Sequence, residues 1–177
     1  MSKSNKVLVA DTGPLIALAG IKQLELLHQL YDTILIPQAV HEEVLVGGSK
    51  LTGLDSYRQA DWLEVTEVAV IAPALLALLD KGEASVIVLA QQRQADIILI
   101  DEQKARKVAR TLFSLNVIGS VRVLLEAKKQ NLISDVKTAL NAMRENGYHL
   151  HDTIVSYALR EAGETAPTLT ESTSHEK

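Results

Sequence analysis

Short apolar runs alternate along the chain with longer stretches in which apolar residues recur every three or four positions. A short, continuously apolar run is typical of a β-strand buried on both faces, whereas the longer period is typical of a helix packed on such strands. The predicted strands are residues 7–10, 33–36 and 96–100, with weaker extended runs at 62–68 and 116–118. The predicted helices are residues 14–30 with an interruption at Gly20, 38–46, 54–60, 73–79, 83–94, 104–112 and, within 121–162, segments separated at 131–134 and 147–149.

Strands that alternate with helices indicate a parallel sheet with helices on its faces. We therefore expect a three-layer α/β/α fold with a central parallel sheet. No internal repeat and no Gly/Ser linker divides the chain, so residues 1–163 are predicted to form a single domain. Residues 164–177 lack an apolar period and are rich in Thr and Ser, which favours a disordered tail.

The composition limits the function without choosing it. The 177-residue chain is 47% hydrophobic and has no cysteine, which supports a globular core and excludes disulfides and thiolate metal sites. A formal net charge of -4 argues against a broad surface that coats nucleic acid. The longest apolar run, residues 68–79, is interrupted by Pro73 and is too short to span a bilayer. We expect a cytoplasmic protein that does not use a membrane.

Two acidic residues follow directly on predicted strands. Asp11 ends the run 7–10, and Asp101 ends the run 96–100. The carboxyl ends of parallel strands meet at one edge of the sheet, where α/β proteins bind ligands. Each aspartate also has a structural interpretation, because an acid at a strand-to-helix joint often caps the helix that follows. Two strands that both end in Asp favour the functional interpretation.

A pair of glutamates lies in the predicted helix 38–46. At about 100° per residue, Glu43 falls roughly 60° from Val40 and flanks the buried stripe. Glu42 falls about 160° from Val40, which favours an outward, solvated position. Glu43 is therefore the better candidate for a site.

Glu83 begins the predicted helix 83–94 at the boundary of the apolar core. The spacing of Asp80 and Glu83 also matches a capping box, in which each side chain satisfies the backbone N–H of the other residue. For Glu83 the structural interpretation is at least as well supported as metal binding.

Carboxylates gathered at one edge repel one another unless a cation neutralises them. Their hard oxygen atoms suit Mg²⁺ or Mn²⁺. Such an ion lowers the pKa of a bound water and offsets the charge that develops on a phosphate oxygen. The set Asp11, Glu43, Glu83 and Asp101 therefore predicts a metal-dependent phosphodiesterase.

The rest of the sequence contains no motif that predicts a different catalytic site. It contains no Walker A loop, GxGxxG turn or GxSxG elbow, and its histidines lack zinc spacing. The predicted helix 104–112 is basic and starts next to Asp101. Such a run is usually a solvated face, but here Lys104 and Arg106 are placed to hold a phosphate backbone.

These segments together resemble a PIN domain, and most closely the bacterial and archaeal PIN-like proteins related to VapC-type toxins. The resemblance covers residues 7–163 and rests on the order and spacing of residues 7–15 (VLVADTGPL), 36–37 leading to 42–44, 82–84 (GEA), 97–101 and 105–106.

The resemblance implies a Mg²⁺- or Mn²⁺-dependent ribonuclease that acts on RNA. It implies that the acidic cluster is Asp11, Glu43, Glu83 and Asp101, and that Thr12 positions a water or a ligand. It also implies a small antitoxin partner and a homodimer. The third acid departs from the pattern, because many VapC-type toxins carry Asp where this chain has Glu83.

Three functions follow as hypotheses. The leading one is a metal-dependent endoribonuclease that is the toxin of a toxin–antitoxin pair. The rival is a non-catalytic PIN-like module that binds RNA or protein, and the third is a small-molecule phosphohydrolase with the same metal chemistry.

Overall fold

A parallel five-stranded sheet forms the centre of the protein. The computed structural model describes residues 4–47 and 53–164. The strands are β1 (Ser4–Ala10), β2 (Tyr31–Pro37), β3 (Leu63–Thr66), β4 (Ile97–Leu99) and β5 (Val117–Ile118). They lie in the order β3-β2-β1-β4-β5, and β1 pairs with both β2 and β4. The predicted three-layer α/β/α fold with a central parallel sheet is confirmed.

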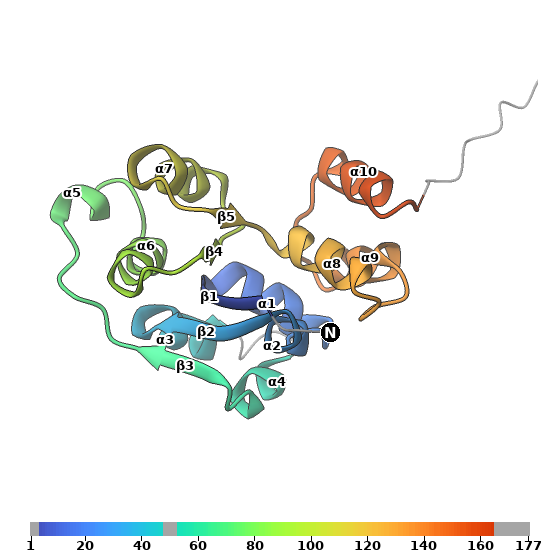
Figure 1. Cartoon of the computed structure of the whole chain (residues 1–177), viewed down its shortest axis with the longest axis horizontal. Helices are drawn as coiled ribbons and strands as arrows, with labels where there is room; N and C mark the ends of the chain where they lie inside the picture. Colours follow the sequence, from blue (N-terminus) through green and yellow to red (C-terminus); the bar gives the residue numbers. More distant parts are fainter. Residues whose placement is uncertain (1–3, 48–52, 165–177) are drawn as a thin grey trace, which may run out of the picture.

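Helices cover both faces of this sheet. They are α1 (Thr12–Gly20), α2 (Glu25–Leu30), α3 (Gln38–Gly47), α4 (Leu54–Gln59), α5 (Pro73–Leu76), α6 (Lys81–Arg93), α7 (Gln103–Phe113), α8 (Ser120–Lys129), α9 (Val136–Glu145) and α10 (Asp152–Glu161). Helix α6 packs on β1, β2 and β4, while α8 contacts α1 and α2. Figure 1 shows α6 and α7 on one side of the molecule and α8, α9 and α10 together on the other. Among the described residues, no helix combines the length and apolar character that a membrane crossing requires.

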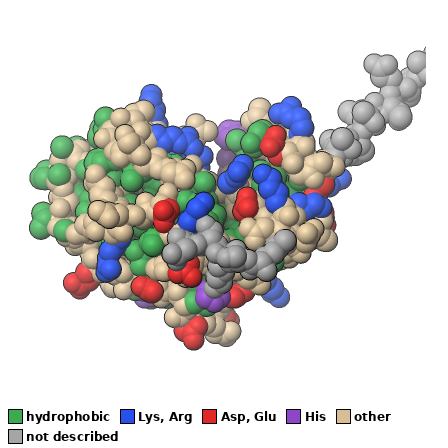
Figure 2. Space-filling model, viewed as in Figure 1, with side chains coloured by type: hydrophobic (Ala, Val, Ile, Leu, Met, Phe, Trp, Pro, Cys, Tyr) green, Lys and Arg blue, Asp and Glu red, His purple; other side chains and the backbone are tan. Residues whose placement is uncertain are grey.

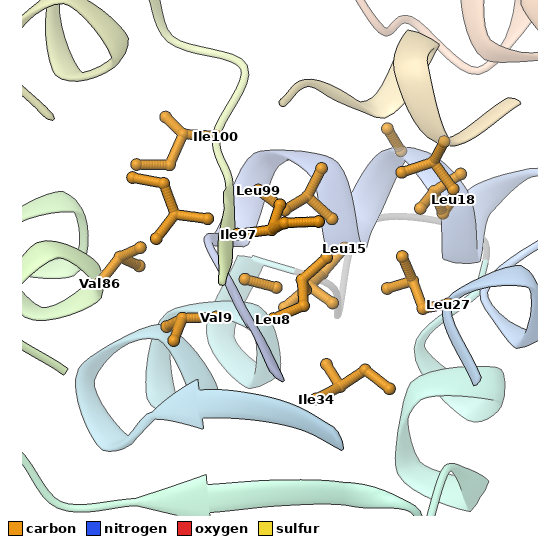
Figure 3. Close-up of a cluster of buried hydrophobic side chains, with 14 of the residues drawn as sticks. Leu8, Val9, Leu15, Leu18, Leu27, Ile34, Val86, Ile97, Leu99 and Ile100 are labelled. Atoms are coloured by element: carbon orange, nitrogen blue, oxygen red, sulfur yellow. The ribbon is translucent and has the colours of Figure 1, made fainter. Parts of the chain in front are cut away.

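The core explains why the central strands are continuously apolar. Successive side chains of a strand point to opposite faces of the sheet. Leu8 of β1 accordingly lies toward Leu15 of α1, while Val9 lies toward Val86 of α6 (Figure 3). All four side chains are fully buried. Both faces of β1 are therefore covered by helices, so the alternation typical of a half-exposed strand is absent.

The interruption predicted at Gly20 within residues 14–30 is confirmed, because α1 ends at Gly20. Lys22 adopts a positive φ of 58°, and its backbone N–H bonds to the carbonyl of Ala19, which ends α1. The chain then restarts in α2 at Glu25. The helix predicted over residues 73–79 is shorter in the structure. Only Pro73–Leu76 are helical, and a turn then leads to α6.

The far end of the predicted domain is held by a side chain of the segment that we expected to be a tail. Glu164 accepts hydrogen bonds from the backbone N–H groups of Val136 and Lys137 at the start of α9, at 2.7 and 2.8 Å. The remainder of the predicted tail, residues 165–177, lies outside the described residues.

Candidate active site

The two strand-end aspartates lie at the same edge of the sheet. The backbone N–H of Asp11 donates a 3.0 Å bond to the carbonyl of Leu99, the last residue of β4. Asp101 follows two residues later. The connection from β3 passes through α6 before the chain returns beside β1 as β4, and ligands of open α/β sheets bind at such a change in strand order.

Asp11 is a buried carboxyl surrounded by other acids. Its side chain occupies the N-cap position of α1 but makes no capping hydrogen bond, and the residue is only 7% exposed. Burial raises the pKa of Asp11 from 3.8 to about 7; the backbone N–H of Thr12 lowers it, and the charges of Asp80, Glu83 and Glu43 add to the rise. Asp11 is therefore not explained as a capping residue. It lies where negative charge is concentrated.

Glu43 reaches this edge from α3. The Thr12 hydroxyl donates a 2.9 Å hydrogen bond to Oε2 of Glu43. The neighbouring Glu42 instead accepts a bond from Gln38 one turn earlier in α3. The two adjacent glutamates thus separate as the helical phase predicts, although both side chains are exposed.

Gly82 allows the acids to approach one another. A Cβ atom placed on Gly82 would lie 2.9 Å from Oε2 of Glu43, 3.4 Å from Oδ1 of Asp80 and 3.7 Å from Oδ1 of Asp11. A side chain at residue 82 would therefore occupy the space on which these three carboxylates converge. Glycine at this position keeps that space open.

Glu83 and Asp80 form the capping box that their spacing predicts. The backbone N–H of Glu83 donates to Oδ1 of Asp80 at 2.8 Å, and the N–H of Asp80 donates to Oε2 of Glu83 at 3.2 Å. Burial and the charge of Asp80 raise the pKa of Glu83. Glu83 therefore has a structural role as part of the N-terminal cap of α6, and this cap lies beside the acidic site.

Asp101 is held by two donors from distant parts of the chain. Its Oδ1 accepts a 2.8 Å bond from the backbone N–H of Ser120, and its Oδ2 accepts a short bond from the Tyr148 hydroxyl. Asp101 does not cap α7, because Glu102 is the N-cap and accepts from the N–H of Ala105 at 2.7 Å. The capping interpretation of Asp101 is therefore wrong for this helix.

Tyr148 lies close to both strand-end aspartates. A Cβ atom on Gly13 would be 3.7 Å from the Tyr148 hydroxyl. Burial raises the pKa of Tyr148, and the charges of Asp101 and, more weakly, Asp11 raise it further.

Arg106 lies near Asp101 at Gly119. Its Nη1 donates a 2.7 Å bond to the carbonyl of Ile100. A Cβ atom on Gly119 would lie 2.7 Å from Oδ1 of Asp101 and 2.8 Å from Nη1 of Arg106, so glycine is required for these groups to lie together. Burial and the charge of Arg110 lower the pKa of Arg106.

A groove leads away from Asp101 between α7, α8 and α10. It encloses about 1450 Å³ and carries more basic than acidic side chains on its walls. The basic residues are Lys6, Lys104, Arg106, Lys107, Arg110 and Arg122, and the acidic ones are Asp101, Glu102 and Glu126. Figure 2 shows Lys and Arg side chains on both sides of the hollow between α7 and α10. The groove is thus suited to an anionic chain that passes Asp101.

These residues suit a divalent cation in the chemistry of their donors but not in their present arrangement. Oxygen donors from Asp11, Glu43 and Asp80 converge at Gly82, and this set suits a hard cation. Within residues 4–47 and 53–164, however, no three His, Cys, Asp or Glu side chains are placed so as to bind an ion as they stand. The oxygen donors suit a hard cation in their chemistry, and exposed side chains such as Glu43 would have to change rotamer to bind one.

Sequence reasoning missed Asp80, Gly82 and Tyr148 as parts of the site. The spacing of Asp80 and Glu83 points only to a capping box, although it also places Asp80 at the start of the helix that carries Gly82. No local pattern points to Tyr148, because its contact with Asp101 spans 47 residues of sequence.

A family model described as a PIN domain, DUF3368, matches residues 7–164. The chain belongs to this PIN domain family. No curated protein matches it. The PIN domain has a nuclease-type fold, and the matched residues include the acidic edge and nearly all of the groove.

Proposed function

We propose that this PIN domain is a Mg²⁺- or Mn²⁺-dependent endoribonuclease. The observation that carries the proposal is the convergence of carboxylates from Asp11, Glu43 and Asp80 around Gly82, at the sheet edge where β4 leads to Asp101. Burial and neighbouring acids raise the pKa of Asp11 to about 7. A buried acid of this kind lowers the stability of the folded protein, so folding does not explain its presence. Perturbed acids of this kind are characteristic of functional sites.

The residues that would hold the ion are Asp11, Glu43 and Asp101, with Glu83 and Asp80 beside them. Glu83 uses Oε2 in the capping box, so Oε1 is the atom with which it would take part. A bound divalent ion would supply a water of lowered pKa and would offset charge on a phosphate oxygen. Thr12 holds the Glu43 carboxylate at the site through its hydroxyl.

The groove supplies the binding surface for RNA. Lys104 and Lys107 lie on α7, whose N-terminus adjoins the acidic edge, and both line the groove. Lys104 is exposed, and its charge lowers the pKa of Glu83 against the larger effects of burial and Asp80, which raise it. Arg106 is fixed on the carbonyl of Ile100 and would contribute its remaining N–H groups. Phosphate contacts of this kind position a strand without reading its sequence.

Cleavage of RNA tests the proposal. The full chain is incubated with a single-stranded RNA in Mn²⁺, alongside D11N and, as a matched control, D32N at an exposed aspartate of β2. Water attack with departure of the 3′-oxygen leaves 3′-hydroxyl and 5′-phosphate ends, which distinguishes the activity from metal-free ribonucleases. We expect cleavage by the parent and by D32N, abolished by EDTA, and a loss of at least 100-fold in D11N. Equal cleavage by D11N and the parent contradicts the proposal.

The proposal extends to the toxin of a toxin–antitoxin pair in the cytoplasm. It is supported by the PIN domain and by the likeness to VapC-type toxins, which implies a small antitoxin and a homodimer. Growth arrest on expression of the parent, relieved by D11N and by co-expression of a small protein encoded next to it, is the expected result. Unimpaired growth with active enzyme present contradicts the toxin role alone.

One observation favours a non-catalytic module as the second candidate. Within the described chain, no three acidic side chains are arranged to bind an ion directly. The carboxylates of Glu83 and Asp101 already accept hydrogen bonds from backbone N–H groups. A module of this kind would bind RNA in the groove with the same affinity with and without Mn²⁺. Metal-dependent cleavage excludes it.

A further inference from the structure

Tyr148 connects the C-terminal helices to the acidic edge. It lies between α9 and α10, and its hydroxyl donates to Oδ2 of Asp101. The other oxygen of Asp101 accepts the backbone N–H of Ser120 at 2.8 Å, at the start of α8. Each oxygen of this carboxylate thus has one protein donor. Since a carboxylate oxygen accepts more than one interaction, both remain able to bind a cation.

The loop that carries Tyr148 is itself fixed. The side-chain amide of Asn146 donates a 2.7 Å bond to the carbonyl of Gly20 at the end of α1. The backbone N–H of Tyr148 donates to the carbonyl of Met143 at 2.9 Å, and Arg144 donates to the carbonyl of Leu150 at 2.9 Å. The Tyr148 ring is therefore held from both sides of the loop, and its hydroxyl has a defined position relative to α1.

That position is against Asp101 and near the start of α1. The hydroxyl contacts Asp101 directly and would be 3.7 Å from a Cβ atom on Gly13, the second residue after Asp11. A tyrosine hydroxyl is protonated at neutral pH and acts as a donor to a carboxylate. Tyr148 also lines the groove, so it stands where the acidic edge and the basic walls meet.

We propose that Tyr148 is a positioning residue that fixes the Asp101 carboxylate for binding a divalent cation. This inference rests on the proposed function, because it assigns Asp101 to the same metal site. Hydrogen bonds to ligating carboxylates set their orientation, and the loss of such a partner typically lowers metal affinity 10- to 100-fold. Tyr148 acts through Asp101 and is not itself a ligand.

The test compares Y148F with Y157F in the full chain. Tyr157 lies on α10, lines the same groove and is 42% exposed, so its substitution changes the groove without removing the donor to Asp101. Mn²⁺ affinity is measured by calorimetry and the Tm by thermal denaturation. We expect Y148F to bind Mn²⁺ at least about tenfold more weakly than the parent with little change in Tm, while Y157F binds as the parent does.

A double-mutant cycle separates positioning from a general structural effect. In a D101N background, Y148F is expected to cause no further loss of Mn²⁺ affinity, because the carboxylate through which Tyr148 acts has been removed. An equal loss in both backgrounds overturns the positioning role. If Y148F does not fold, p-aminophenylalanine at residue 148 retains a donor, and Mn²⁺ binding below half of the parent's affinity overturns the proposal.

Kinetics give a second readout. At subsaturating Mn²⁺ we expect Y148F to lower kcat, to keep KM for RNA, and to recover as Mn²⁺ is raised. If the parent binds Mn²⁺ and Y148F binds it equally well, this inference alone fails. If the parent binds no Mn²⁺ and cleaves no RNA, the proposed function fails together with it.

Discussion

The Thr12 hydroxyl donates a 2.9 Å hydrogen bond to Oε2 of Glu43. This bond joins the residue that follows Asp11 to helix α3, and it favours Glu43 over Glu42 as the glutamate of the candidate site. Thr12 is buried, whereas Glu43 is exposed, so the threonine is the fixed partner and the glutamate the oriented one.

Replacing Thr12 by Val should release Glu43 from the acidic edge. A lost hydrogen bond of this kind is worth about 1 kcal/mol, which corresponds to an affinity for Mn²⁺ lower by about fivefold. T12S keeps the hydroxyl and should bind Mn²⁺ as the parent does. Calorimetry on the two variants checks the result, and equal affinities for T12V and T12S would count against the role of this bond.

Gly82→Ala should weaken Mn²⁺ binding and RNA cleavage without lowering the Tm. Alanine has the better helix propensity, by up to about 1 kcal/mol, so the Tm should be unchanged or higher. Its Cβ would approach Oε2 of Glu43 to 2.9 Å, which pushes the carboxylate out of the site. We expect Mn²⁺ binding and RNA cleavage to fall at least tenfold while the protein stays folded. A variant that is stable and fully active refutes the convergence at Gly82.

Asp11 should give the metal-free protein a pH-dependent stability. Its pKa in the folded protein is about 7, raised from 3.8 chiefly by burial. The folded state therefore binds a proton more tightly than the unfolded state, and the free energy of unfolding falls as the pH rises from about 4 to about 7. In EDTA, the Tm of D11N should exceed that of the parent at pH 8, and the difference should shrink towards pH 4. A difference that is the same at both pH values contradicts the assignment.

The strand-end acids were predictable because they depend on local pattern and on a general rule of parallel sheets. The alternation of strands and helices places the carboxyl ends together, and the helical phase separates Glu43 from Glu42. The Asp80–Glu83 capping box was likewise visible in the spacing.

What escaped prediction depends on packing between distant segments. Tyr148 is brought to Asp101 by the fold of α8, α9 and α10 against α1, and no periodicity encodes that contact. The convergence of Asp80 and Asp11 at Gly82 depends on the packing of α6 on β1, and the absence of a Cβ at Gly82 leaves room for their carboxylates. The interruption predicted at Gly20 is confirmed, because α1 ends at that residue, but the positive φ of Lys22 in the turn that follows could not be predicted from its residue type.

Lys104→Ala should weaken RNA binding by the metal-free protein. Loss of one phosphate contact to a single strand should lower the slope of log K against log salt by about 0.7. Lys129, exposed on α8 outside the groove lining, is the matched control, and K129A should bind RNA as the parent does. Binding is measured in EDTA so that cleavage does not interfere. Identical salt slopes for K104A and K129A would remove Lys104 from the proposed RNA path.

Binding of a divalent cation at the acidic edge is best tested by a calorimetric titration with Mn²⁺. The titration compares the metal-free parent with E43Q and E42Q, which change adjacent exposed glutamates of the same helix. The account predicts saturable Mn²⁺ binding by the parent, unchanged binding by E42Q, and binding at least tenfold weaker in E43Q. No binding by the parent, or equal binding by E43Q and E42Q, would contradict it.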